Sequence, residues 1–226
     1  MERRFERELE GLKTSLIKMG SVAEQNFTNA IKALMEDDAD LATKVIESDE
    51  RINSLEIEID NDIIDLLALQ QPVASDLRLI IAAQKINNDL ERLGDHAVNI
   101  AESVVDLVKT PGQEPLLEIP KMADIARSMF RHALDSFILL DPELAKKVLE
   151  RDDQIDDLNR EMSKRVIEMI KSDKKSIEGG LQLIRISRNL ERVADLTTNI
   201  AEEVIFLTQA RVVKHHAEEK SKAPPN

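Results

Sequence analysis

The chain repeats itself, and this repeat limits most strongly what it can fold into. The segment "ADLATKVIESDERINSLE" from Ala39 matches "PELAKKVLERDDQIDDLN" from Pro142 at an offset of 103 residues. The segment "NNDLERLGDHAVNIAE" from Asn87 matches "SRNLERVADLTTNIAE" from Ser187 at an offset of 100 residues. Each half must therefore form the same supersecondary unit, and the change of offset belongs in a turn, where insertions are tolerated.

Apolar residues recur every three or four positions in three stretches of each half. These stretches are 5–34, 41–66 and 86–107 in the first half, and 122–140, 144–169 and 183–207 in the second. Such spacing is typical of antiparallel helices that pack near 20° to one another, and no alternating pattern indicates a strand. We therefore predict an all-α fold of two pseudo-symmetric three-helix up-down bundles that arose by internal duplication.

Turn signals separate the predicted helices. Pro142 is expected at the first position of a helix, and Asp76 is expected to cap the third helix. The stretch "KTPGQEPLLEIPK" contains three prolines and a glycine and is the predicted linker between the bundles. We expect the first bundle over 1–110, the second over 116–210 and a disordered tail over 211–226.

The composition excludes several classes of protein. A net charge of −13, with no Trp or Tyr and only five Phe, argues against nucleic-acid binding. The absence of Cys excludes thiolate metal sites. No signal peptide and no run of 18 apolar residues is found, so a cytoplasmic protein without membrane insertion is expected.

Two pairs of like charges stand four residues apart on predicted helices. Glu91 and Asp95 form the first pair, and Glu191 and Asp195 form the second. Two like charges at this spacing share one helix face and destabilise a helix by roughly 0.2–0.5 kcal/mol. Retention of both pairs in a duplicated chain suggests that something compensates for the repulsion.

Folding each half back at its second turn brings a third carboxylate to each pair. The hairpin register places Asp49 within a helical turn of Asp95, and Asp152 next to Asp195. Clustered carboxylates repel one another unless they are protonated or neutralised by a cation. The predicted metal ligands are therefore Asp49, Glu91 and Asp95 in the first half, and Asp152, Glu191 and Asp195 in the second.

The alternative is a solvated flank balanced by ordinary ion pairs. Arg92 and Arg192 stand next to the pairs, and Arg188, where the first half has an Asn, is placed to pair with Glu191 and weaken the second site. Gly94 is a small residue that would permit close helix approach at the first pair. Oxygen ligands alone would suit Mg²⁺ or Ca²⁺.

No pattern of catalytic residues is found. Glu-x-x-His, which di-metal oxidases of the ferritin type need, does not occur, and neither does a phosphate-binding Gly-x-x-x-x-Gly-Lys. His96 and His132 have no counterpart in the other half. A non-enzymatic protein is expected, and the alternatives are a metal-dependent hydrolase that uses the carboxylates or a metal-free helical adaptor.

The segments "QPVASDLRLIIAAQKINNDLERLGDHAVNIAE" and "ISRNLERVADLTTNIAEEVIFL" resemble the two signature motifs of the PhoU family of phosphate-uptake regulators. The resemblance covers the chain from about Phe5 to Leu207. It implies a cytoplasmic, usually dimeric protein that acts with the ATPase subunit of the phosphate-specific ABC transporter and with a phosphate-sensing histidine kinase. It also implies repression of the phosphate regulon and, in some members, a multinuclear iron or zinc cluster at these motifs.

Overall fold

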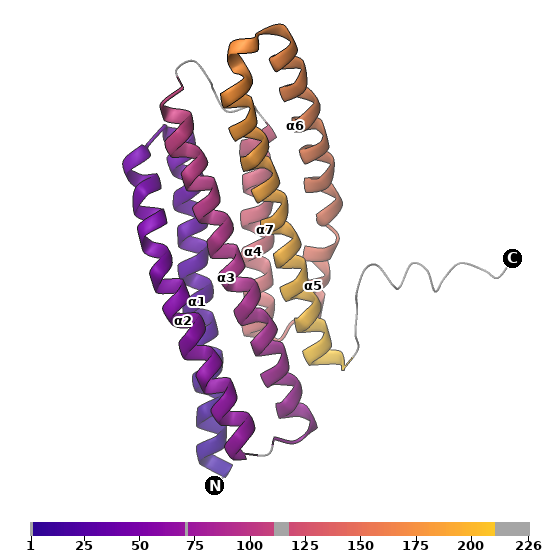
Figure 1. Cartoon of the computed structure of the whole chain (residues 1–226). Coiled ribbons are helices and arrows are strands. Elements are labelled where there is room, and N and C mark those ends of the chain that lie inside the picture. The colour runs from indigo at the N-terminus through magenta and orange to yellow at the C-terminus, as the bar shows by residue number, and fades with distance from the viewer. Residues whose placement is uncertain (1, 71, 111–117, 211–226) are drawn as a thin grey trace, which may run out of the picture.

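The computed structural model describes residues 2–70, 72–110 and 118–210, and their regular structure is helical throughout (Figure 1). The elements are α1 (Glu2–Glu36), α2 (Ala39–Gln70), α3 (Ala74–Val108), α4 (Glu118–Leu139), α5 (Pro142–Leu149), α6 (Asp152–Ser172), a 3-10 turn (Lys174–Ser176) and α7 (Ile177–Gln209). Helices α1 to α3 pack as one up-down bundle and α4 to α7 as the other, which confirms the predicted all-α fold. The predicted linker and tail fall largely on 111–117 and 211–226, outside the described residues, so the domain bounds stay predictions.

The apolar residues that recur every three or four positions in the sequence form the buried core of the structure. In α1 the buried stripe, at most 1% exposed, is Leu12, Leu16, Met19, Ala23 and Phe27. In α3 it is Ile86, Leu90, Leu93, Ala97 and Ile100, again at most 1% exposed. Burial of each large side chain of this kind stabilises the fold by about 1.5–3 kcal/mol relative to exposure. The helices are therefore held mainly by these stripes.

Aspartates shape the first turn of each bundle. The Asp38 carboxylate accepts a hydrogen bond from the backbone N–H of Leu41 at 2.8 Å. In the second bundle, Asp141 accepts from the N–H groups of Glu143 at 2.9 Å and Leu144 at 3.2 Å. Pro142 lies at the first helical position, as predicted. These contacts satisfy amide groups that would otherwise have no partner in the helix.

The prediction of one continuous helix over 144–169 is wrong. The helix breaks between α5 and α6, where Arg151 adopts φ −100° and ψ −9° and donates to the Ser128 hydroxyl of α4 at 2.7 Å. The equivalent residue of the first bundle, Ser48, is placed to donate to the carbonyl of Val45 at 2.8 Å and to Asn26 Oδ1 of α1 at 2.9 Å, within an unbroken α2. Both residues therefore contact the neighbouring helix, and the helix is interrupted only at the longer Arg151.

The predicted cap of α3 is also wrong. The residue before α3 is Val73, in an extended conformation, and no side chain forms a capping hydrogen bond there. Asp76 lies within the first turn instead. A carboxylate in the first turn still favours the helix through its dipole, by about 0.3–1 kcal/mol.

The two bundles join through α3 and α7, which lie side by side and antiparallel in the centre of the molecule (Figure 1). Lys85 of α3 contacts Glu203 of α7 at 2.7 Å, and Arg185 of α7 contacts Glu102 of α3 at 2.6 Å. Lys85 and Arg185 are repeat equivalents, while their partners Glu203 and Glu102 stand one position apart in the repeat. Helices α2 and α6 flank this central pair.

Helices α1 and α4 form the other contact between the bundles. A Cβ atom added to Gly20 of α1 would lie 2.6 Å from Leu134 Cδ2 of α4. A larger residue at Gly20 would therefore require the buried Leu134 side chain to move.

Candidate metal centre

The first carboxylate cluster lies between α2 and α3. Asn87 fixes the register of these helices, because its side-chain amide donates to the Glu56 carbonyl at 3.1 Å and to Asp60 Oδ1 at 2.8 Å. In this register Asp49 lies close enough to Asp95 for their charges to interact. The hairpin register predicted from the sequence is therefore confirmed for the first bundle.

Burial and mutual repulsion both disfavour the charged forms within this cluster. Burial raises the pKa of Asp49, and the negative charge of Asp95 raises it further, while a 3.1 Å hydrogen bond from Asn53 lowers it. Burial likewise raises the pKa of Glu91, and the charges of Asp95, Glu56 and Asp49 raise it further, while the charge of Arg92 lowers it. Glu56 was not among the predicted residues, although it follows Asp49 by seven positions and so shares its helix face.

One oxygen of the cluster has no hydrogen-bonding partner. Asp49 Oδ1 is buried without a donor. A Cβ atom on Gly94 would lie 3.4 Å from this oxygen and 2.7 Å from Ile52 Cδ1. Gly94 therefore allows the close helix approach that its position suggested. A bare carboxylate oxygen beside two further carboxylates is a donor set that fits a cation.

The second cluster contains its own cation. Arg192 donates to Asp195 at 2.8 Å and lies 3.5 Å from Glu191. Burial raises the pKa of Glu191, and so do the charges of Asp195, Asp156 and Asp152, while Arg192 lowers it. The structure therefore brings Asp152 to the second pair, as predicted. Asp156 is an additional member that sequence reasoning missed, and the residue that contacts Glu191 is Arg192 rather than the predicted Arg188.

The equivalent arginine of the first bundle points elsewhere. Arg92 lies 3.8 Å from Asp89, which faces the interface between the bundles. Asp89 is only 7% exposed and accepts a hydrogen bond from Asn199. Burial raises the pKa of Asp89 to about 6, against the favourable effects of Asn199 and Arg92. The charge of Arg92 still lowers the pKa of Glu91, so the two clusters differ in whether an arginine contacts the carboxylates directly.

The carboxylates of neither cluster surround a common point. Within residues 2–70, 72–110 and 118–210, no group of three His, Asp or Glu side chains stands ready to hold a metal ion. A metal would have to draw the side chains of a cluster together by rotamer changes. Metal binding at the six predicted residues therefore stays a prediction.

Asn99 and Glu102 are identical in both halves, and both lie at the interface between the bundles. Arg185 donates to Asn99 Oδ1 at 3.0 Å and to Glu102 Oε2 at 2.6 Å. His96 contacts Asn189 at 2.8 Å across the same interface. Packing of α3 against α7, not the carboxylate clusters, explains why Asn99 and Glu102 are retained in the repeat.

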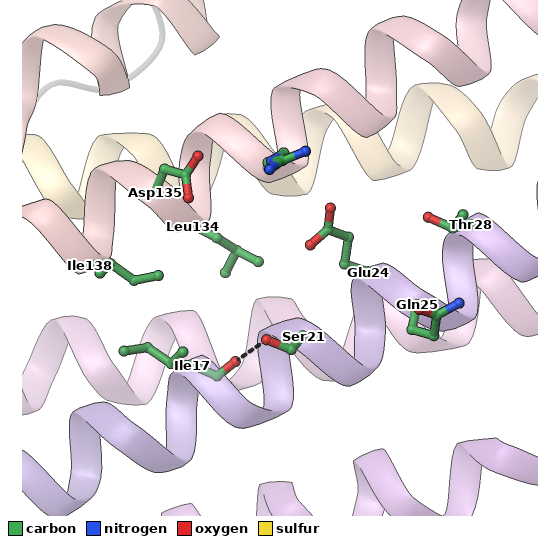
Figure 2. Close-up of a pocket in the computed structure, with 9 residues that line it drawn as sticks. Ile17, Ser21, Glu24, Gln25, Thr28, Leu134, Asp135 and Ile138 are labelled. Carbon is green, nitrogen blue, oxygen red and sulfur yellow. Dashed lines mark hydrogen bonds between the residues drawn. The ribbon is translucent and has the colours of Figure 1, made fainter.

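A groove of about 400 Å³ runs between α1 and α4. Figure 2 shows Leu134 and Ile138 on the α4 side facing Ile17 and Ser21 on the α1 side. The Ser21 hydroxyl donates to the carbonyl of Ile17 at 2.9 Å, so it is already satisfied within its own helix. Charged residues of both signs line this groove, which gives it no clear ligand preference.

In the part of the chain that the structure describes, every helix is too polar or too short to cross a lipid bilayer.

Known proteins resemble this chain over nearly its full length. The PhoU domain profile matches residues 16–104 and 119–204. The phosphate-specific transport system accessory protein PhoU homologue of Aquifex aeolicus is 38% identical over 215 residues, which are 95% of this chain and 97% of that protein. The homologue of Clostridium acetobutylicum is 36% identical over 210 residues, 92% of this chain and 96% of that protein.

Solved structures agree with these relatives. The crystal structure of PhoU from Pseudomonas aeruginosa has a TM-score of 0.88 and 35% identity, over 92% of this chain and all of that one (100%). The phosphate transport system regulatory protein PhoU from Streptococcus pneumoniae has a TM-score of 0.87 and 32% identity, over 93% of this chain and 100% of that one.

Proposed function

Because the chain belongs to the PhoU family, we propose that it is a non-enzymatic accessory regulator of phosphate-specific transport, which restrains phosphate uptake and represses the phosphate regulon. The observation that carries the proposal is the 38% identity to the Aquifex aeolicus accessory protein across 97% of that protein's length. The named relatives are described as accessory or regulatory proteins of phosphate transport.

The proposed partners are the ATPase subunit of the phosphate transporter and a phosphate-sensing histidine kinase, and the proposed setting is the cytoplasm. The chain would act as a homodimer that connects the two partners. Long helical flanks support this role, because α1, α2, α3 and α7 each span 32 residues or more and offer extended surfaces.

The clustered carboxylates would hold a metal cofactor in this proposal. Asp49, Glu91 and Asp95 would hold it in the first bundle, where Asp49 Oδ1 already lacks a partner. A bound iron or zinc cluster, or Mg²⁺ or Ca²⁺, would supply positive charge there. These three side chains would then link α2 and α3 by coordinating the same metal ion or cluster.

Deletion of the gene tests the proposed function. We expect a reporter of phosphate-regulon expression to rise in phosphate-rich medium after deletion and to return to its basal level when the gene is restored on a plasmid. An unchanged reporter in the deletion strain would refute the proposal. Isothermal titration calorimetry of the purified chain against the ATPase subunit and the cytoplasmic part of the kinase then identifies the direct partner.

A further inference from the structure

A polar cavity of about 420 Å³ lies where α3 of the first bundle faces α7 of the second. Its charged members are Lys85 and Asp89 of α3 and Glu202 and Glu203 of α7. Asp89 and Glu203 are each only 7% exposed, so solvent screens their charges poorly. None of the residues that line this cavity belongs to the two carboxylate clusters.

Glu203 carries an oxygen without a partner. Its Oε1 atom accepts from the Lys85 ammonium at 2.7 Å, whereas Oε2 is buried and meets no hydrogen-bond donor among the described residues. Buried polar atoms in native folds normally have a partner, and where the protein supplies none, an ion or an ordered water does. Glu203 therefore offers an acceptor for a ligand at the interface.

Asp89 brings a second carboxylate to Glu203 from the other bundle. Burial raises the pKa of Asp89, and the negative charge of Glu203 raises it further, so the two carboxylates are close enough to repel each other. Two buried carboxylates from different helices are a donor set for a cation.

The charges around the cavity do not balance. Three carboxylates line it, against the single ammonium of Lys85. Arg92 lies 3.8 Å from Asp89 and is half exposed, and its charge compensates only one more of them. An excess of negative charge therefore remains between two packed helices.

The opposite end of the same helix pair provides an internal comparison. The repeat equivalents of the two buried carboxylates are Asn189 and Ser103, which carry no charge. At that end Arg185 pairs with Glu102 at 2.6 Å. Packing of α3 against α7 thus does not require a pair of buried carboxylates, and the pair at one end calls for another explanation.

We propose that Asp89 and Glu203 bind a partly hydrated Mg²⁺ ion at the interface between the bundles. Mg²⁺ takes oxygen ligands, is commonly held by one or two carboxylates and keeps several of its water molecules. The cavity has room for such waters, and the amide side chains of Asn88 and Asn199 also line it. The lining includes no His and the chain has no Cys, which disfavours Zn²⁺.

Lys85 does not prevent this binding. It contacts only one oxygen of Glu203, its side chain is 44% exposed, and it lies 5.5 Å from the ring centre of Phe206. Lys85 therefore keeps both solvent and an aromatic face as partners when the ion takes its place beside Glu203. The bound ion would tie α3 of one bundle to α7 of the other, independently of the proposed function.

Electron paramagnetic resonance with Mn²⁺, a probe for Mg²⁺ sites, tests the proposal on the purified full chain. The starting protein carries substitutions that disable both carboxylate clusters, namely Glu91→Ala, Asp95→Ala, Glu191→Ala and Asp195→Ala. We expect this protein to bind Mn²⁺ stoichiometrically and to release it to excess Mg²⁺. Adding Asp89→Asn with Glu203→Ser, the residues of the opposite end, should raise Kd by about tenfold or more, since even outer-shell partners of a metal have effects of that size.

The matched control is Asp106→Asn with Glu178→Ser. It removes the same two charges from exposed positions of α3 and α7, outside the cavity, and should leave Kd unchanged. Differential scanning calorimetry gives a second readout. Mg²⁺ should raise the thermal midpoint of the starting protein and of the control, but not that of the variant without Asp89 and Glu203.

Three results would overturn the site. They are a starting protein that binds no Mn²⁺, an unchanged Kd after Asp89→Asn with Glu203→Ser, and an equal loss of affinity in the control, which would indicate attraction to net charge alone. Circular dichroism confirms that each variant is folded. If the starting protein does not fold, the same two substitutions in the wild type must lower the number of bound Mn²⁺ ions. The reporter of phosphate-regulon expression tests the proposed function separately.

Discussion

Arg192 donates a 2.8 Å hydrogen bond to Asp195, whereas Arg92, its equivalent in the first half, lies 3.8 Å from Asp89 and acts on Glu91 only through its charge. The second carboxylate cluster therefore contains a guanidinium in direct contact with its carboxylates, and no such contact is found among the described residues of the first cluster. A metal ion that enters the second cluster must compete with this guanidinium. The two clusters should accordingly differ in cation affinity.

Arg192→Gln should strengthen cation binding at the second cluster. We expect up to about a fivefold lower Kd, because a surface ion pair of this kind contributes up to about 1 kcal/mol. Titration calorimetry with Mg²⁺ and Zn²⁺ measures this in a background that carries Glu91→Ala and Asp95→Ala. Arg188→Gln is the matched control, and the same gain in both variants would contradict the role given to Arg192.

Removal of metal should lower the thermal midpoint of the wild type, because a ligand that binds only the folded state stabilises it. Glu91→Ala with Asp95→Ala should abolish the response of the first cluster and retain that of the second. Differential scanning calorimetry with and without a chelator measures both effects. Protein that holds no stoichiometric metal after incubation with iron, zinc and magnesium would show that the carboxylates are ordinary surface charge.

Asp89→Asn should stabilise the metal-free protein at neutral pH. The pKa of Asp89 is about 6 in the fold against 3.8 for the free side chain, so the folded state holds this proton more tightly. Protonated Asp89 makes its whole contribution to the free energy of unfolding below about pH 4, and this contribution is lost as the pH rises to about 6. Above that range, Asp89→Asn should increase the free energy of unfolding by at most about 3 kcal/mol.

Urea unfolding at pH 4 and pH 7.5 measures this difference. Asn is the residue that the second half carries at the equivalent position, Asn189. Asp76→Asn, in the first turn of the same helix, is the control and should show no such gain at high pH. If the free energy of unfolding of Asp89→Asn rises equally at both pH values, the charge of Asp89 is not the cause.

Gly94→Val should destabilise the fold by about 1–3 kcal/mol through overpacking. Even a Cβ atom there would lie 2.7 Å from the buried Ile52 Cδ1, whereas a Cβ on Gly11 would meet nothing within 4 Å. Gly11→Val is therefore the matched control in urea unfolding. Addition of Ile52→Ala to Gly94→Val should recover part of the loss, since the two sites are in contact. Equal midpoints for the two valine variants would contradict the clash.

Much of the fold could be predicted because helix spacing and hairpin register are local properties. The three- and four-residue spacing of apolar residues identified the core of each helix. Antiparallel pairing about a single turn was enough to bring Asp49 to Asp95 and to place Asp152 beside the second pair, where its charge acts on Glu191 rather than on the expected Asp195. These relationships depend on residues within one hairpin, which the sequence lists in order.

Other features depend on which side-chain contacts form, and the apolar spacing does not contain them. Asp89, which Arg92 contacts, accepts a hydrogen bond from Asn199 of the other bundle, and the break beside Arg151 accompanies its contact with Ser128. Glu102 is identical in both halves, and its partner is Arg185 on α7 rather than a residue of the carboxylate clusters. A repeat shows that a residue is retained without showing which neighbour it meets.

The antiparallel pairing of α3 with α7 has a consequence for the origin of the molecule. A single three-helix unit could form the same contact with a second copy of itself, as an isologous dimer in which each subunit offers the same surface. Fusion into one chain removes the requirement that both sides be identical. The contact pair Asp89 and Asn199 is mirrored by Asn189 and Asn99, and Glu203 by Ser103, so the fused halves have diverged where a symmetric dimer could not.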